Sequence, residues 1–136
     1  MFPLPFNPMW IGNEVFCGTG MQRIDLLIKQ ENEDFIFIKI IELKDDKIQL
    51  DWVQQQLSWY IKWVLWYIVP SYLSSTKKKI IVIPCIIVPS VKSSQYYELA
   101  QEEIVCLEDR VEISKLEVVL FHSLNDLLSF RKVIFN

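Results

Sequence analysis

Two acidic residues and one lysine stand in parts of the sequence where apolar side chains predominate. Asp25 belongs to a segment in which apolar and polar residues alternate. Glu42 interrupts a long apolar run whose only other polar residue is Lys39, and Lys44 follows two positions later. Because alternate residues of a β-strand share one face, we expect the Glu42 and Lys44 side chains to project from the same side.

These three residue types suit one kind of chemistry. Two carboxylates buried together are unfavourable unless a cation compensates their charge. Mg²⁺ takes one or two carboxylates together with waters and phosphate oxygens, and a neighbouring lysine can orient or deprotonate a water and stabilise charge on a phosphate. Asp25, Glu42 and Lys44 therefore predict metal-dependent hydrolysis of a phosphodiester. The alternative is an ordinary salt-bridged strand end on the surface of a sheet.

A β-hairpin must position these side chains. The hydrophobic pattern predicts strands over 23–29 and 35–44, joined by a polar turn. If the turn is centred near Asn32–Glu33, Asp25 lies opposite a residue close to Ile40. Glu42 has the same parity as Ile40, so the pattern places both carboxylates on one face at the open end of the hairpin.

The rest of the chain predicts a mixed sheet. Residues 1–20 are rich in proline and are expected to form an irregular arm. The later elements are expected as a helix over 49–69 that ends before Pro70, a loop over 71–79, a strand over 80–88, a helix over 90–103, a strand over 116–121, and a short helix or edge strand over 125–136. This order predicts an α/β (α+β) fold in a single domain, 1–136, with a central mixed sheet flanked by helices on both faces.

Composition limits the class of protein. The chain has 136 residues, 51% of them hydrophobic, which argues against disorder and indicates more apolar surface than one small domain can bury. A homodimer is the expected outlet. A net charge of −3 is unusual for a nucleic-acid-binding protein, but clustered carboxylates that bind a cation reverse the local field.

Several features point to a cytoplasmic protein. No signal peptide and no membrane-spanning stretch is evident, so no membrane partner is expected. The cysteines Cys17, Cys85 and Cys106 lie far apart without CxxC spacing, which disfavours a zinc or iron–sulfur site within one chain and is typical of reduced intracellular thiols.

The order of the motifs resembles the PD-(D/E)XK nuclease superfamily. Ile24-Asp25 is followed by Ile41-Glu42-Leu43-Lys44, which looks like that signature. The string from Arg23 to Leu27 is similar to the archaeal NucS-type endonucleases and their RecB-like relatives, and Gln56 to Tyr60 fits the QxxxY motif of RecB-like nucleases. The resemblance covers about residues 18–70.

This resemblance implies a restriction-endonuclease-like core and a nuclease activity on DNA, specifically an endonuclease acting on structured or single-stranded DNA. It implies Asp25 and Glu42 as ligands of Mg²⁺ or Mn²⁺, with the Leu43 backbone carbonyl as a third ligand. Lys44 would be the catalytic lysine. The residues implied to support the site or contact the substrate backbone are Arg23, Gln56 and Tyr60.

The chain also departs from the family pattern. Many relatives carry an acidic residue on a helix before the first strand, and here Glu14 is the only nearby candidate. The RecB-like nucleases of CRISPR adaptation need four cysteines for a cluster, and this chain has three. That subfamily is disfavoured.

A tryptophan stripe distinguishes the helix expected over 49–69. Its aliphatic residues fill one arc, and a second arc holds Trp52, Trp59, Trp63 and Trp66. Such a stripe is typical of a protein core or a dimer interface, and it could also stack nucleic-acid bases. Lys77–Lys79 could contact phosphate or end a solvated loop, and His122, the only histidine, lacks a nucleophile partner.

Two alternatives to a nuclease remain. One is a catalytically inactive nucleic-acid-binding or assembly module that keeps a nuclease-like fold, which the acidic charge and the proline-rich start both favour. The other is a structural homodimer whose functional surface is the tryptophan stripe.

Overall fold

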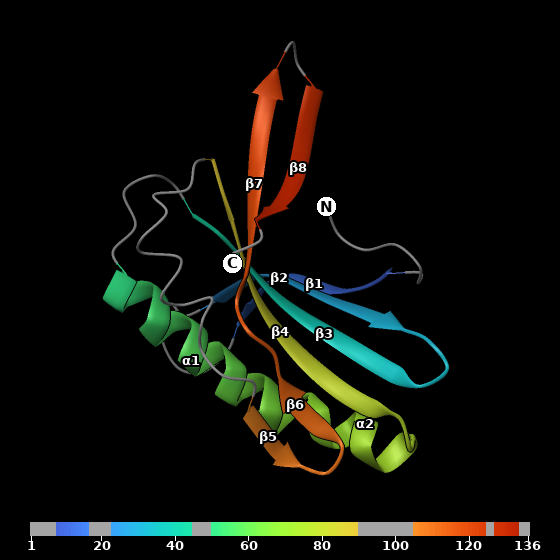
Figure 1. Cartoon of the computed structure of the whole chain (residues 1–136). Helices are drawn as coiled ribbons and strands as arrows, with labels where there is room; N and C mark the ends of the chain where they lie inside the picture. The colour runs from blue at the N-terminus through green and yellow to red at the C-terminus, as the bar shows by residue number, and fades with distance from the viewer. Residues whose placement is uncertain (1–7, 17–22, 45–49, 90–104, 125–126, 134–136) are drawn as a thin grey trace.

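An eight-stranded mixed β-sheet forms the centre of the fold, in a computed structural model that describes residues 8–16, 23–44, 50–89, 105–124 and 127–133. The α+β class and the mixed sheet are therefore confirmed (Figure 1). Both helices within these ranges pack against the same hydrophobic cluster, on one face of the sheet. The second covering helix was expected over 90–103, which lies outside the described residues.

The predicted hairpin is present as β2 (Arg23–Glu31) and β3 (Phe35–Leu43), which pair antiparallel. The predicted register was wrong by two residues, because Ile40 lies opposite Leu27 and not Asp25. The cause is Asn32, whose side-chain Oδ1 accepts hydrogen bonds from the amides of Asp34 (2.9 Å) and Phe35 (2.7 Å). This Asx-type turn moves the hairpin centre one residue along the chain.

The expectation of an irregular arm was wrong for residues 8–16. They form β1 (Pro8–Phe16), an outer strand that pairs antiparallel with β2 and has an irregularity between Trp10 and Gly12. Pro8 is tolerated because it occupies the first position of a strand at the sheet edge, where its missing N–H breaks no ladder of hydrogen bonds.

A helical crossover joins β3 to the parallel strand β4 (Lys79–Val88). It contains α1 (Leu50–Tyr67) and the short α2 (Val69–Ser75). The end of the long helix before Pro70 is confirmed, but the loop expected over 71–79 is wrong for residues 71–75. Pro70 lies in the first turn of α2, where a missing amide hydrogen leaves no intrahelical bond unmade, so the same proline both ends one helix and begins the next.

Pro84 stands in the middle of β4, a central strand, where a missing N–H would usually break the sheet. On the side of β4 away from β3, the neighbouring strand changes at this point. Before Pro84 the neighbour is β6 (Val111–Ile113), and from Cys85 onward it is β7 (Glu117–Leu124). The proline is therefore placed where β4 exchanges one partner strand for another.

The outer strands complete the sheet. β5 (Val105–Glu108) pairs antiparallel with β6, and β8 (Leu127–Val133) pairs antiparallel with β7. Of the two alternatives for residues 125–136, the edge strand is confirmed over β8. The β5–β6 hairpin was not predicted.

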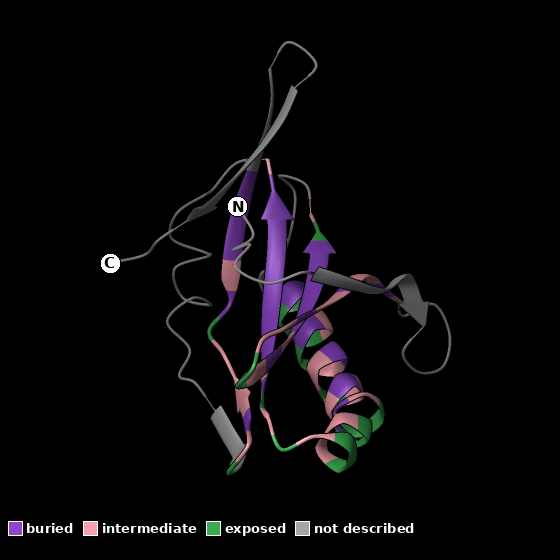
Figure 2. Cartoon of the chain, turned by 90° about the vertical axis from the view of Figure 1, so that its right-hand side faces the viewer, coloured by how far each residue is buried: buried purple, intermediate pink, exposed green. Residues whose placement is uncertain are grey.

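The hydrophobic core lies on both faces of β3 and β4. On the helix-covered face, α1 contributes Tyr60 and Val64 against Ile38 and Ile40, and Figure 2 shows buried residues along β3, β4 and the inner side of α1. On the other face, Ile41 packs in a separate cluster with Cys85, Ile87 and Val119. Within the described ranges, neither helix is long and apolar enough to cross a membrane.

Candidate active site

Asp25 and Glu42 meet where the β2–β3 hairpin opens. The last residue pair of the β2–β3 ladder is Leu26 with Ile41, so the next position brings Asp25 beside Glu42. The Asp25 amide donates to Glu42 Oε1 (3.2 Å), and the Leu43 amide donates to Asp25 Oδ2 (2.9 Å). Each carboxylate thus accepts a hydrogen bond from a backbone amide of the opposite strand. These two bonds stand where the next backbone–backbone pair of the sheet would be.

Glu42 is almost fully buried, with 2% of its surface exposed, on the face of β3 that α1 covers. The pKa of the Glu42 carboxyl is raised to about 8, chiefly by burial and in addition by the nearby Asp25 charge, against the opposing effects of the Asp25 amide and Lys44. A cation beside Glu42, whether the Lys44 ammonium or a metal ion, would favour the ionised form of its carboxyl. Asp25 is only partly buried, so the pair has access to solvent from the Asp25 side.

Lys44 and Gln56 form the other side of the site. Lys44 Nζ donates to Gln56 Oε1 on α1 and lies 3.8 Å from Glu42 Oε2. The Lys44 amide donates to the Ile87 carbonyl of β4 (3.0 Å), which fixes the backbone just past β3. The site therefore combines Glu42 from β3, Lys44 from the segment after it, and Gln56 from α1. Asp25 comes from the adjoining strand β2.

The remaining predicted site residues occupy different environments. Tyr60, one helical turn after Gln56, is 2% exposed and belongs to the core, so it can support the site only through packing. Arg23 is partly buried at the start of β2. Leu43 is exposed, and its amide donates to Asp25. Glu14 lies on β1 between Asn13 and Val15, whose partners flank Asp25, so the backbone register sets Glu14 across from Asp25.

The donor set is small. Within the described ranges, no group of three or more His, Cys, Asp or Glu side chains is arranged to hold a metal ion. Asp25 and Glu42 are two carboxylates, which is the number that Mg²⁺ commonly takes from a protein when waters and substrate oxygens complete its shell. One oxygen of each carboxylate accepts from a backbone amide, so Oδ1 of Asp25 and Oε2 of Glu42 are the oxygens a cation would take.

The tryptophan stripe is not uniform along α1. Trp59 and Trp63 are partly buried and pack against the core. Trp52 at the beginning of the helix is 55% exposed, and Trp66 near its end is 60% exposed. The stripe therefore consists of a packed middle and two exposed ends, of which the Trp52 end is one helical turn from Gln56.

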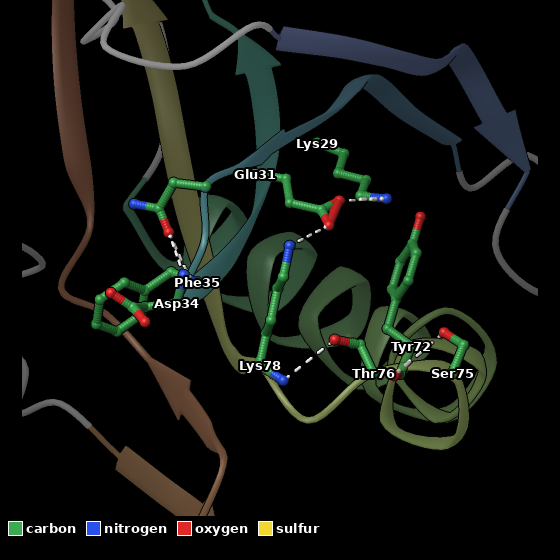
Figure 3. A network of polar contacts seen from close by, with 9 residues as sticks. Lys29, Glu31, Asp34, Phe35, Tyr72, Ser75, Thr76 and Lys78 are labelled. Atoms are coloured by element: carbon green, nitrogen blue, oxygen red, sulfur yellow. Dashed lines mark hydrogen bonds and ion pairs between the residues drawn. The ribbon is translucent and has the colours of Figure 1, made fainter.

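The lysines of residues 77–79 lie far from this site. They precede β4, whose parallel pairing with β3 sets Lys79 beside Phe35, at the opposite end of the sheet from Glu42. Lys78 is bound to Glu31 (2.7 Å), and Glu31 also pairs with Lys29 (3.1 Å), as Figure 3 shows. Lys79 pairs with Glu112 (3.1 Å). These contacts favour a structural role for Lys78 and Lys79 and separate them from the Asp25–Glu42 pair.

Sequence reasoning missed one buried ion pair. Lys39 Nζ lies 3.3 Å from Glu117 Oε2, and the Lys39 side chain is 1% exposed. The pair reaches from β3 to β7 across the intervening strand β4. Its signal was present in the sequence, since Lys39 is the other polar residue of the apolar run that contains Glu42. Nothing in the sequence identified Glu117 as its partner.

Not every candidate joins the site. His122 lies in β7 opposite Ser129, on a strand that adjoins neither β2 nor β3. The site that the structure assembles is therefore Asp25, Glu42, Lys44 and Gln56. When the chain is compared with known proteins, no family model, no curated protein and no solved structure matches it.

Proposed function

We propose that this chain is a divalent-metal-dependent nuclease of the PD-(D/E)XK type, with a restriction-endonuclease-like core, which hydrolyses DNA phosphodiester bonds. The observation that carries the proposal is the contact between Lys44 and Gln56 beside Glu42. Lys44 and Gln56 come from two separate sequence motifs, and a salt-bridged strand end would require no helix residue at this position.

In the proposed reaction a bound Mg²⁺ or Mn²⁺ would polarise the phosphodiester and lower the pKa of an attacking water. Asp25 and Glu42 would hold the ion, with the Leu43 carbonyl as a further ligand. The amide hydrogen bonds that fix one oxygen of each carboxylate restrict the rotation of both side chains, so the ligands are oriented before an ion binds.

Lys44 would act on the phosphate and on the water. Gln56 holds the Lys44 ammonium in place, and Glu42 Oε2 lies 3.8 Å from it, so the positive charge stays at the edge of the carboxylate pair. A fixed ammonium there can stabilise the charge that develops on a phosphate oxygen or orient the water. Gln56 is a positioning residue, since it acts through Lys44.

The test is cleavage of labelled single-stranded, duplex, flap and four-way-junction DNAs with Mg²⁺, Mn²⁺ or EDTA. We expect cutting that requires a metal, and loss of at least a thousandfold in rate for Glu42→Ala and Lys44→Ala. Glu112→Ala is the matched control, because it removes a carboxylate that pairs with a lysine at the opposite end of the sheet. Cleavage that persists in Glu42→Ala would contradict the proposal.

A second function is favoured by one specific observation. Both carboxylates already accept backbone amides, so they close the end of the hairpin without any ion. This is what a nucleic-acid-binding or assembly module that keeps the fold without catalysis would need. DNA binding that is equal in EDTA and Mg²⁺, with no cleavage of any substrate in the panel, would support that function over the nuclease.

The surface also favours a homodimer. Trp66 and Tyr67 are both more than half exposed at the end of α1, beyond the packed part of the tryptophan stripe. Adjacent exposed aromatic side chains of this size are typical of interfaces between proteins. We propose that a second copy of the chain covers them.

A further inference from the structure

Trp52 is a large aromatic side chain that stays exposed beside the candidate active site. It is 55% exposed, although Val53, the next residue of α1, is fully buried in the core. Trp52 precedes Gln56 by four residues, so the two side chains are neighbours on one face of the helix, about 6 Å apart at their Cβ atoms. Gln56 in turn contacts Lys44.

The charge around this part of α1 suits a nucleic acid better than the net charge of the whole chain does. Among the described side chains of α1 that are exposed, the only charged one is Lys62. The others are aromatic, amide or hydroxyl side chains, including Gln54, Gln55 and Ser58. Among the α1 side chains that the structure describes, a phosphate backbone that follows this face meets no exposed carboxylate, despite the net charge of −3.

We propose that Trp52 stacks on an unpaired base of the nucleotide next to the phosphate at the Asp25–Glu42 site, so that the substrate is single-stranded at the point of cleavage. This inference rests on the proposed function, because the phosphate site defines where the base lies. An indole face can stack on any base, but a base within a duplex is already stacked and paired. Neighbouring nucleotides lie several ångströms apart, which is similar to the spacing of Trp52 and Gln56 along one face of the helix.

The exposed Trp66 provides a matched comparison on the same helix. It is fourteen residues beyond Trp52, which is about 21 Å along the axis of α1. It has a similar exposure, 60% against 55%. Loss of Trp66 therefore removes an indole that is similarly exposed in the single chain but too far away to reach the base beside the scissile phosphate.

The experiment combines these variants with a scan of abasic positions. Oligothymidylates that each lack one base are bound to wild type, Trp52→Ala, Trp52→Phe and Trp66→Ala, with anisotropy measured per protomer in EDTA. Trp52→Ala should weaken binding of the intact strand about tenfold, and Trp52→Phe should restore most of it. For one abasic position the Trp52→Ala effect should disappear, since no base remains to stack there. Trp66→Ala should show no such coupling at that position.

The proposal would be overturned if Trp52→Ala bound the intact strand as wild type does, or if its effect were the same at every abasic position. Tighter binding of a blunt duplex than of the single strand would also overturn it. These results are separable from a failure of the nuclease proposal. Metal-dependent cleavage without Trp52 coupling would contradict the stacking alone, whereas Trp52 coupling without any cleavage would contradict the nuclease alone.

Discussion

Glu42 is the residue whose environment differs most from that of a surface carboxylate. It lies beneath α1, between the Asp25 amide and the Lys44 ammonium, and burial raises the pKa of its carboxyl to about 8. A protein that used Glu42 only to close a hairpin could place a neutral amide there at lower cost. The retained acid is explained if a cation binds beside it.

Replacing Glu42 with Gln should stabilise the metal-free protein at alkaline pH. From the ordinary pKa of 4.5 up to about 8, folded Glu42 keeps a proton that the unfolded chain has released. The folded state therefore binds more protons, and wild-type stability falls as pH rises through this window. Glu42→Gln cannot ionise, so its melting temperature in EDTA should exceed that of wild type by several degrees at pH 8 and by less at pH 5.

Glu31→Gln is the control for this pH effect. Hydrogen bonds from Lys78 and Lys29 hold the pKa of the Glu31 carboxyl below its usual range, so Glu31 contributes stability above its unfolded pKa and loses it as pH falls. Glu31→Gln should consequently show no gain at pH 8. If Glu42→Gln followed the wild-type melting curve from pH 5 to 8, the buried state of Glu42 would be contradicted.

Divalent metal should stabilise the protein more strongly as pH rises. Binding to the folded state raises the free energy of unfolding according to ligand concentration and affinity, and it requires the ionised form of Glu42. We expect 10 mM Mg²⁺ to raise the melting temperature of wild type more at pH 8 than at pH 6. Asp25→Asn and Glu42→Gln should lose this rise, while Glu112→Gln keeps it. An equal rise in all four proteins would locate the ion elsewhere.

At the scale of elements, sequence periodicity predicted the central part of the fold. Alternation around Asp25 and the apolar run around Glu42 predicted the β2–β3 hairpin, and the helical pattern before Pro70 predicted α1. The errors arose where proline was taken only as a breaker of structure. Pro8 begins β1 and Pro70 lies in the first turn of α2, because both occupy positions where an amide hydrogen is not needed.

The candidate site was predictable as a set of residues but not as a geometry. Parity alone placed Asp25 and Glu42 on one face, and a register error of two residues preserved that result because strand faces repeat every two residues. The reciprocal amide bonds between Asp25, Glu42 and Leu43 depend on the true register, which the Asn32 side chain sets. The sequence separation of Gln56 and Lys44 did not predict their contact, because it depends on where α1 begins and how the helix lies against β3.

The buried Lys39–Glu117 pair should connect β7 to the centre of the sheet. Removing one member of a buried ion pair weakens the compensation of the other and commonly costs about 3 kcal/mol. Glu117→Leu should therefore lower the free energy of unfolding by roughly that amount in urea. The double variant Lys39→Met with Glu117→Leu should recover most of the loss, since neither charge then remains buried. Losses that simply added would show that the two side chains do not interact.

The whole molecule has two chemically different ends. The C-terminal end of β3 and the start of α1 lie on the same side in Figure 1, and they bring together the candidate active site and Trp52. At the other end, Figure 3 shows ion pairs around Glu31 that join the β2–β3 turn to the segment after α2. Arg110 reinforces that end by donating to the carbonyls of Leu73 (2.9 Å) and Thr76 (2.6 Å). The candidate active site and these supporting contacts are therefore separated along the sheet.

Self-association should depend on the end of α1 that is remote from Trp52. Trp66 and Tyr67 are 60% and 67% exposed. The Tyr67 ring packs beside Trp63 of the tryptophan stripe, with 5.6 Å between the ring centroids. We expect wild type to be a dimer in light scattering coupled to gel filtration, and Trp66→Ser with Tyr67→Ser to be a monomer. Both substitutions are at exposed positions, so the melting temperature of the monomer should change little beyond what dissociation itself removes.

The same double variant also tests whether the active site is complete within one chain. Asp25, Glu42, Lys44 and Gln56 are all supplied by one protomer, so cleavage per protomer of a short single-stranded substrate should persist in the monomer. Trp52→Ser serves as the control, because it removes an exposed indole from the opposite end of α1 and should leave the dimer intact. A wild type that is monomeric at micromolar concentration would contradict the dimer. If Trp52→Ser disrupted the dimer, the Trp52 indole would belong to the dimer interface and would not stack on a nucleobase.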